Sequence, residues 1–295
     1  MPSDTAVFTR EITEEDHAEV AELLGRGFHY PRAYFKKLLE EMYRRGAPET
    51  CPKYGYALIR GERIVGAVLL ISTLMEERGE TFIRSHVTSW FVEPELRPLA
   101  ALFLARGLKR KDIAYINVSA RDWTRPIIEK QGFRRYSNGQ VLIPTALVAL
   151  RSVKPGLKLH ASAEGPGDTT NFERRLMIDH ARYGCNCIWC LEDGVAWPFV
   201  FHDLPIKRVV PAVQLVYCRD IDGFSRFAPL LSRYLLRRGK AVIRLDSNGP
   251  ISDLPGIYRE GVDPRFCKGR QPRQGDLAYT QLAMRPFQRT QTEHF

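Results

Sequence analysis

Apolar residues at helical spacing open the chain. They predict one helix that begins after Thr13 and ends by Gly27, and a second that begins after Pro31 and ends at Gly46, with apolar stripes at Val20, Leu23 and Leu24 and at Phe35, Leu38, Leu39 and Met42. Lysine, arginine and glutamate occupy most of the other positions of the second segment. Two amphipathic helices are therefore expected near the start of the chain.

Apolar segments of strand length follow from residue 56. Segments 56–59 and 64–71 are joined by Gly61-Glu62, which predicts a hairpin, and the nearly continuous apolar character of 64–71 indicates a strand buried on both faces. The remaining elements expected in the first half are a strand at 85–92, a helix at 98–108, a strand at 113–118, a short helix at 124–131, and strands near 133–136 and 141–150.

The second half repeats this order. A hairpin at 188–201, a strand at 212–217, an amphipathic segment at 224–235 and a strand at 241–245 follow their first-half counterparts at a nearly constant offset, and Gly261-Val262 is matched with Gly132-Phe133. The repeat predicts an α/β (α+β) chain of two tandem domains, residues 1–152 and 153–295. The polar, Pro- and Gly-containing stretch from Ser152 to Gly156 is the expected seam.

Composition and charge narrow the class of protein. Of 295 residues, 44% are hydrophobic and 26% are charged, which is typical of a soluble globular chain. No stretch approaches the roughly 18 apolar residues of a membrane helix, and residues 1–10 lack the apolar core of a signal peptide. A cytoplasmic location is expected. The net charge of +10 suits either a polyanionic partner or simply a basic solvated surface.

The six cysteines invite a metal interpretation at Cys185, Cys187 and Cys190. However, this run reads as a strand, in which Cys185 and Cys187 share a face and Cys190 points to the other. Tetrahedral zinc sites usually combine two separated pairs of ligands. We therefore expect reduced, buried, apolar thiols and no metal.

The most informative segment is 89–102, where a strand ends, the chain bends at Pro94, and a helix begins beside Arg97. A helix start presents free backbone N–H groups and the positive end of the helix dipole, which suits a phosphate. Two further segments accompany it: Tyr115-Ile116-Asn117-Val118-Ser119-Ala120 and Ile128-Glu129-Lys130-Gln131-Gly132-Phe133.

These segments make the first half resemble the Gcn5-related N-acetyltransferase superfamily, which transfers acyl groups from acyl-coenzyme A. Val92, Pro94 and Arg97 match the approach to the family's phosphate loop, and residues 128–133 resemble its Tyr-Glu-Lys-x-Gly-Phe ending. The resemblance covers about residues 7–150, and the second half looks like a degenerate copy. It implies two domains, each with a mixed, mainly antiparallel central sheet flanked by helices.

The resemblance also implies a binding site for acetyl-CoA or another acyl-CoA at Phe91, Val92, Arg97, Leu99, Ala100 and Ala101. This chain departs from the family pattern: Pro98, Ala100 and Leu102 stand where the loop has glycines, and Ile128 stands where a tyrosine often acts as general acid. In the second half, Asp220 and Asp222 occupy the corresponding turn and would repel a pyrophosphate. We therefore expect acyl-CoA in the first half only.

Catalytic candidates follow from the resemblance, which places the reaction centre where the fourth and fifth strands separate: His86, Ser89, Asn117, Ser119 and Tyr136. His86 could act as a base near neutral pH; a structural hydrogen bond within the strand is the favoured alternative. Asn117 and Ser119 could bind the acyl carbonyl or pantetheine amides, or simply end a strand.

The favoured function is therefore acyl transfer from acyl-CoA, by direct attack, to the amine or hydroxyl of a small, carbohydrate or amino-acid-type acceptor. Two alternatives stay open. One is an aminoacyl transferase that uses aminoacyl-tRNA, which would explain why the second half is the more basic, although the aromatic–basic alternation of a nucleic-acid platform is missing. The other is a non-catalytic binding protein of the same fold. Neither a nucleic acid nor a membrane is an expected partner, and no oligomeric state is predicted.

Overall fold

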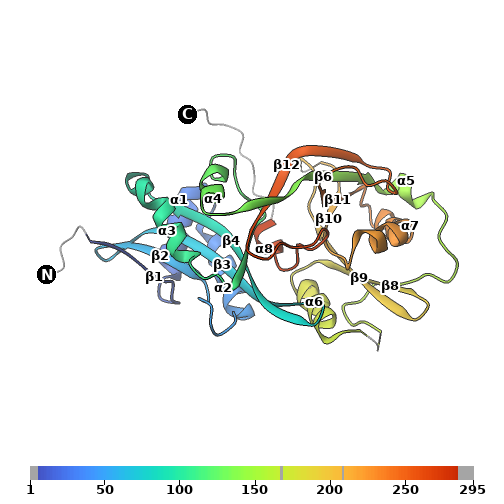
Figure 1. The fold of residues 1–295 in the computed structure, drawn as a ribbon, viewed down its shortest axis with the longest axis horizontal. Coiled ribbons are helices and arrows are strands. Elements are labelled where there is room, and N and C mark those ends of the chain that lie inside the picture. Colours follow the sequence, from blue (N-terminus) through green and yellow to red (C-terminus); the bar gives the residue numbers. More distant parts are fainter. Residues whose placement is uncertain (1–5, 167–168, 208, 285–295) are drawn as a thin grey trace. The chain divides into compact units, whose positions relative to one another are not determined.

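The structure, a computed structural model, describes residues 6–166, 169–207 and 209–284. It contains two compact units (Figure 1). Unit 1 comprises the chain up to Tyr136 together with Arg265–Gln271, and unit 2 comprises Ser137–Pro264 and the chain from Pro272. This division follows Tyr136, whereas the sequence suggests a seam near residue 153. None of the helices in the described ranges is long and apolar enough to cross a membrane.

Unit 1 is built on five consecutive strands of one sheet. Its elements are β1 (Val7–Glu11), α1 (His17–Phe28), α2 (Arg32–Arg45), β2 (Gly55–Arg60), β3 (Arg63–Glu77), β4 (Glu80–Val92), the 3₁₀ helix η1 (Pro94–Leu99), α3 (Ala100–Gly107), β5 (Ile113–Asn117), α4 (Arg125–Lys130) and the start of β6 (Arg134–Pro144). The predicted helices and strands are present up to α4. Strands β3 and β4 are longer than predicted, because they meet in a tight turn at Arg78-Gly79, both with positive φ.

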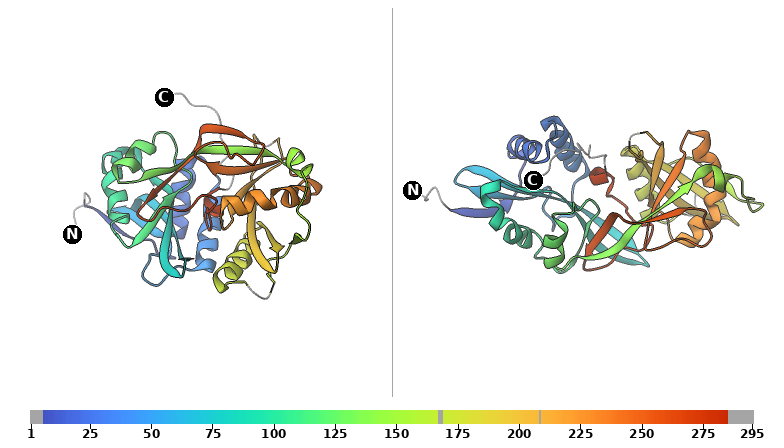
Figure 2. Two further views of the ribbon diagram at one scale, coloured as in Figure 1. Left: turned by 45° about the vertical axis from the view of Figure 1, so that its right-hand side comes forward. Right: turned by 90° about the horizontal axis from the view of Figure 1, so that it is seen from above.

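The sheet of unit 1 runs β1-β2-β3-β4-β5, antiparallel except for the parallel pair β4–β5. Helices α1 and α2 cover one face and α3 and α4 the other (Figure 2, right). Strand β3 is buried along residues 64–72, as its continuous apolar run predicts. Ile128 is 1% exposed in the core on the α3 side, so it packs rather than donates a proton.

A strand from far along the chain completes this sheet. Phe266, Cys267 and Lys268, the end of β12 (Ile257–Lys268), pair antiparallel with β5. Phe266 is fully buried in the unit 1 core, the Lys268 Nζ donates to the carbonyl of Leu108 (3.3 Å), and Arg270 pairs with Glu77 and Glu80 on the β3–β4 hairpin. Tertiary pairing with β5 therefore makes this short segment a strand.

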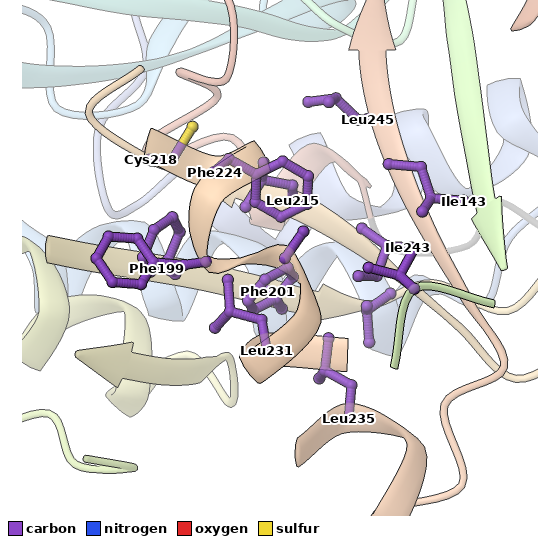
Figure 3. Packing of buried hydrophobic residues seen from close by; sticks show 14 of the residues in the cluster. Ile143, Phe199, Phe201, Leu215, Cys218, Phe224, Leu231, Leu235, Ile243 and Leu245 are labelled. Atoms are coloured by element: carbon purple, nitrogen blue, oxygen red, sulfur yellow. The ribbon is translucent and has the colours of Figure 1, made fainter. Parts of the chain in front are cut away.

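The strands of unit 2 lie in the order β6-β11-β10-β9-β8-β7. Its elements are the main part of β6, α5 (Thr145–Ala149), β7 (Lys158–His160), α6 (Asn171–Arg182), β8 (Asn186–Glu192), β9 (Val195–Asp203), β10 (Ala212–Tyr217), α7 (Ile221–Arg237), β11 (Val242–Ser247), the first part of β12, and α8 (Gln281–Met284). Helix α7 packs its apolar face on β9, β10 and β11, as shown by Phe199, Leu215, Phe224 and Leu231 in Figure 3.

Two sequence predictions for this region are wrong. The strands expected at 133–136 and 141–150 are a single strand, β6, which ends at Pro144 and is followed by helix α5. Gly139 lies inside β6, where the carbonyl of Arg259 approaches so closely that a Cβ on this residue would lie 2.2 Å from it. Gly261 lies within strand β12 and is not, like Gly132, at a helix end.

The two units share their order of elements and their register. In both, a hairpin is followed by an antiparallel strand, a helix and a parallel strand. The parallel ladder of unit 1 ends at the pair His86–Ile116, and that of unit 2 ends at the pair Gln214–Arg244. Each member of the second pair stands 128 residues after its counterpart, so the repeat read from the sequence has a defined structural register.

Candidate functional site

Strands β4 and β5 separate in the middle of unit 1. Their parallel ladder joins Ile83–His86 to Ile113–Ile116 and stops there within the described chain. Just beyond, β4 contains a bulge: Thr88 pairs with Leu69 and Phe91 with Ala67, and Ser89 adopts a left-handed φ of 49°. A bulge bends its strand and interrupts pairing. We call the region beyond the last ladder pair the β4–β5 fork.

His86 lies at the base of this fork. Its ring is 2% exposed, and its Nε2 accepts a hydrogen bond from the backbone N–H of Val118 at 3.3 Å. The proton of the neutral ring is therefore on Nδ1, for which the described residues provide no partner. Burial, together with the nearby positive charges of Arg265 and Arg45, lowers the pKa of His86 to about 3. The geometry thus gives His86 the structural hydrogen bond that the sequence left as an alternative to a base.

The other predicted catalytic residues lie on different elements: Ser89 in β4, Asn117 and Ser119 at the end of β5, and Tyr136 in β6. Ser89 forms the bulge and is buried, with its Oγ 3.5 Å from that of Thr88. The Asn117 Oδ1 accepts from the backbone N–H of Ser119 (3.0 Å), so this amide oxygen ends β5 in a tight local turn. Tyr136 is buried on β6 at the end of unit 1. His86, Asn117 and Ser119 therefore gather where the two strands part.

The predicted phosphate turn takes a different form from the expected free helix start. Helix η1 runs directly into α3, and the N–H of Ala100 already donates to the carbonyl of Arg97. Pro94 and Pro98 have no N–H. Leu99, the last residue of η1, and Ala101, in the first turn of α3, are half-buried, and Arg97 is exposed. The turn therefore offers an anion the Arg97 guanidinium rather than a row of backbone donors.

Phe91 and Val92 face other parts of unit 1. The ring of Phe91 lies against α1, where a Cβ on Gly27 would come within 2.4 Å of it, and Val92 is 5% exposed in the core. Phe91 also borders a surface pocket of about 450 Å³ lined by Arg26, Arg60, Arg63, Glu93, Pro94 and Glu95. One Glu93 oxygen holds both Arg26 and Arg63 at 3.3 Å, so much of the charge in this pocket is paired internally.

In unit 2 the equivalent fork is occupied by the chain itself. Beyond the pair Gln214–Arg244, β10 is bulged between Leu215 and Tyr217. Residues 273–280, here called the strap, pair with this part of β10: Cys218 N–H donates to the Gly275 carbonyl (3.0 Å) and Leu277 N–H donates to the Val216 carbonyl (2.8 Å). Tyr217 and Asp276 form an antiparallel bridge between these two bonds.

Both ends of the strap are fixed. The Arg273 guanidinium donates to the carbonyls of Cys218 and Arg219, while at the other end the Tyr279 N–H donates to His180 Nε2 (3.0 Å) and its hydroxyl to Asp179 (3.0 Å) on α6. Gly275 packs so tightly that a Cβ would lie 2.5 Å from the sulfur of Cys218. The sequence gives no sign of the strap, because its residues follow neither a helical nor a strand periodicity.

Helix α7 begins with a side-chain cap. The Asp220 carboxylate accepts from the N–H of Gly223 at 2.6 Å, and Asp222 follows in the first turn. Both carboxylates therefore stand at the turn where unit 1 has Arg97.

The cysteines of unit 2 are packing residues. Cys187 donates to the Met177 carbonyl (3.2 Å) on the α6 side, whereas Cys190 lies in the core on the α7 side, so the predicted alternation along this strand is confirmed. Burial raises the pKa of the Cys187 and Cys218 thiols to about 12, which keeps them protonated.

No family model and no curated protein matches the sequence. Solved structures do match the fold. A Gcn5-related N-acetyltransferase from Anabaena variabilis aligns with a TM-score of 0.62 and 10% identity over 89% of this chain and 72% of that one. A probable N-acyltransferase from Enterococcus faecalis aligns with a TM-score of 0.59 and 10% identity over 92% and 74%.

The chain has the Gcn5-related N-acetyltransferase (GNAT) fold. A third GNAT protein, from Kribbella flavida, aligns with a TM-score of 0.57 and 13% identity over 89% of this chain and 70% of that one. The predicted α/β class, a mixed sheet flanked by helices, is confirmed. The strap pairs with the fork of unit 2. Among the described residues it makes no backbone pair with the β4–β5 fork of unit 1.

Proposed function

We propose that the protein transfers an acyl group from acetyl-CoA or another acyl-CoA to an amine or hydroxyl of a small acceptor, at the β4–β5 fork of unit 1. One observation carries the proposal. In unit 2, the fork of matching register pairs with an extended backbone through amide N–H and carbonyl groups. The pantetheine arm of CoA is also an extended chain with amide groups, so the same hydrogen-bonding edge on β4 suits it.

Residues of unit 1 have distinct parts in this proposal. The bulge at Ser89 bends β4 beside the thioester, Asn117 and Ser119 border the fork at the end of β5, and Arg97 faces the phosphates. The acceptor attacks the thioester carbonyl directly, and backbone N–H groups near Val92 stabilise the developing oxyanion. The C–S bond then breaks, CoA leaves as the thiolate, and the proton lost by the acceptor is available to it. With His86 neutral and hydrogen-bonded, Ser119 and Tyr136 are the hydroxyl groups proposed to handle the proton.

Unit 2 is proposed not to bind acyl-CoA. The strap pairs with β10 at its fork, and Asp220 and Asp222 bring negative charge to the turn that would meet the phosphates. The expected stoichiometry is therefore one acyl-CoA per chain. The acceptor is proposed to be a small molecule rather than a nucleic acid.

Calorimetry with acetyl-CoA and longer acyl-CoAs tests the proposal. We expect one site per chain, and Arg97→Glu should weaken binding about tenfold or more, because it removes a phosphate partner and adds repulsion. Arg106→Glu is the matched control: the same charge change on an exposed arginine at the far end of α3. Absence of binding by any acyl-CoA at millimolar concentration would refute the proposal, as would equal effects of the two variants.

A second candidate is a non-catalytic GNAT-fold binding protein. The observation in its favour is the phosphate turn, where two prolines and the Ala100–Arg97 hydrogen bond reduce the number of free backbone donors. The two candidates differ in turnover. Release of free CoA from acetyl-CoA, followed with a thiol reagent across a panel of amine and sugar acceptors, supports the transferase. Stoichiometric binding without release across that panel supports the binding protein.

A further inference from the structure

The backbone of Val118 is held by side chains on both sides. Val118 lies two residues beyond the last β5 residue of the β4–β5 ladder. Its N–H donates to His86 Nε2 at 3.3 Å, and its carbonyl accepts from the Arg265 guanidinium. Buried backbone groups of a sheet normally pair with a neighbouring strand. Here two buried side chains, 2% and 4% exposed, replace that strand.

The replacement of a backbone partner by a side chain bears on how closely β4 and β5 can approach each other at Val118. Hydrogen-bonded strands lie about 4.8 Å apart, with no room for a side chain between them. His86 belongs to β4, and its Nε2 accepts from the Val118 N–H that a backbone carbonyl of β4 would bond if the parallel ladder continued. A ring that takes this bond in place of a backbone carbonyl would keep β5 from closing onto β4, and the Arg265 guanidinium donates to the carbonyl of the same residue.

Unit 2 uses a comparable arrangement at the matching position. Asp246 stands 128 residues after Val118, and its carbonyl also accepts from a side chain, the Gln274 amide, at 3.3 Å. The residue that matches His86 is Gln214. In this unit the fork held apart contains an extended backbone, the strap.

We propose that His86 and Arg265 are positioning residues that hold β4 and β5 apart at Val118, and so keep the fork of unit 1 wide enough for the extended amide chain of an acyl-CoA. This inference rests on the proposed function for its ligand but not for its structural half. It also assigns Arg265, which the strand β12 brings to unit 1 from late in the sequence, a part in the site.

The charged groups that act on His86 are Arg265 and Arg45, both positive, so the ring stays neutral across the physiological range. A positioning imidazole and a catalytic base therefore differ in their pH profiles. A base would give a rate inflection near its titration, whereas a positioning residue gives none between pH 5 and 9.

The test compares His86→Gln with His86→Leu in the full chain. Glutamine places an oxygen near the position of Nε2 and is the residue that the chain carries at 214. Leucine removes the acceptor. We measure hydrogen exchange of the Val118 amide by NMR and acetyl-CoA affinity by calorimetry. His86→Leu should speed exchange and weaken affinity, each by about tenfold, as expected for one lost buried hydrogen bond. His86→Gln should stay within about threefold of the wild type.

Several outcomes would overturn the inference. Equal Val118 exchange in the wild type and His86→Leu would refute the structural half, even if acetyl-CoA binds to neither and the proposed function fails separately. Equal acetyl-CoA affinity in those two proteins would refute the functional half. A rate inflection near pH 6.5 that disappears in His86→Gln would make His86 the base instead. If His86→Leu does not fold, Arg265→Met against Arg265→Lys gives the same affinity comparison.

Discussion

At the scale of single residues, the place of a side chain in the sheet decides its chemistry. A histidine near other polar residues at a strand separation suggests a base, because its ordinary pKa lies near 6.5. In the structure, burial and two arginines lower the pKa of His86 to about 3, and its Nε2 accepts a hydrogen bond from the Val118 N–H. Residue type and order place His86 at the fork, but only the surrounding contacts distinguish its two possible roles.

The lowered pKa of His86 predicts a pH-dependent stability. The unfolded chain binds a proton below about pH 6.5 and the folded chain only below about 3, so stability rises with pH between these values. The contribution is complete above pH 6.5 and is lost as the pH falls toward 3, by at most about 1.4 kcal/mol per pH unit. Urea unfolding at pH 7, 5.5 and 4 should therefore show a steeper loss for the wild type than for His86→Gln. Parallel losses would contradict the prediction.

At the scale of elements, the sequence predicts those helix and strand bounds that are set by neighbouring residues. The bounds of β10 follow from a short apolar run, and α2 ends at Gly46, whose φ of 70° suits glycine. The apolar run 141–150 misleads because Pro144 ends β6, after which Thr145 opens a helix and bonds the Lys240 carbonyl (2.7 Å). The strap cannot be predicted from hydrophobic periodicity, because its conformation is fixed by hydrogen bonds to β10 and α6.

Gly275 gives the strap its closest contact, and this predicts a difference between two glycine substitutions. Gly275→Ala must adopt a φ of 80° and place a methyl group 2.5 Å from the Cys218 sulfur, so it should lower the free energy of unfolding of unit 2 by about 2–4 kcal/mol. Gly194→Ala has the same backbone strain (φ 82°) in open space and should cost about 1 kcal/mol.

Urea unfolding of unit 2 measures both variants when it is followed by the fluorescence of Trp189 and Trp197 in a chain whose unit 1 tryptophans, Trp90 and Trp123, are replaced by phenylalanine. Equal losses of stability in Gly275→Ala and Gly194→Ala would mean that the strap is held loosely, contrary to its hydrogen bonds.

At the scale of the whole molecule, neither unit is a continuous stretch of chain. The sequence suggests two consecutive halves, since each half contains a complete order of elements. The structure gives unit 1 residues 265–271. Phe266-Cys267, flanked by Arg265 and Lys268, is too short an apolar run to predict which strand it pairs with. Its pairing with β5, about 150 residues earlier in the chain, depends on how its side chains fit against that strand rather than on local strand preference.

A substitution at Phe266 tests whether residues 265–271 support unit 1. Phe266→Ala should destabilise unit 1 by about 3–5 kcal/mol, because it empties a fully buried site in that core. Phe199→Ala, an equally buried phenylalanine in the unit 2 core, is the matched control. Hydrogen exchange should rise in β5 for Phe266→Ala and in β8–β10 for Phe199→Ala. Faster exchange confined to unit 2 after Phe266→Ala would show that residue 266 does not support unit 1.

The late strand of unit 1 has a consequence for synthesis on the ribosome. Residues up to Tyr136 emerge first, yet the edge of β5 finds its partner only when Phe266–Lys268 have been made. At translation rates of about 5–20 residues per second, the nascent sheet keeps an open edge for on the order of ten seconds. Open edges invite pairing with other chains. We therefore expect the yield of this protein to fall when translation is slowed, because the β5 edge then stays unpaired for longer.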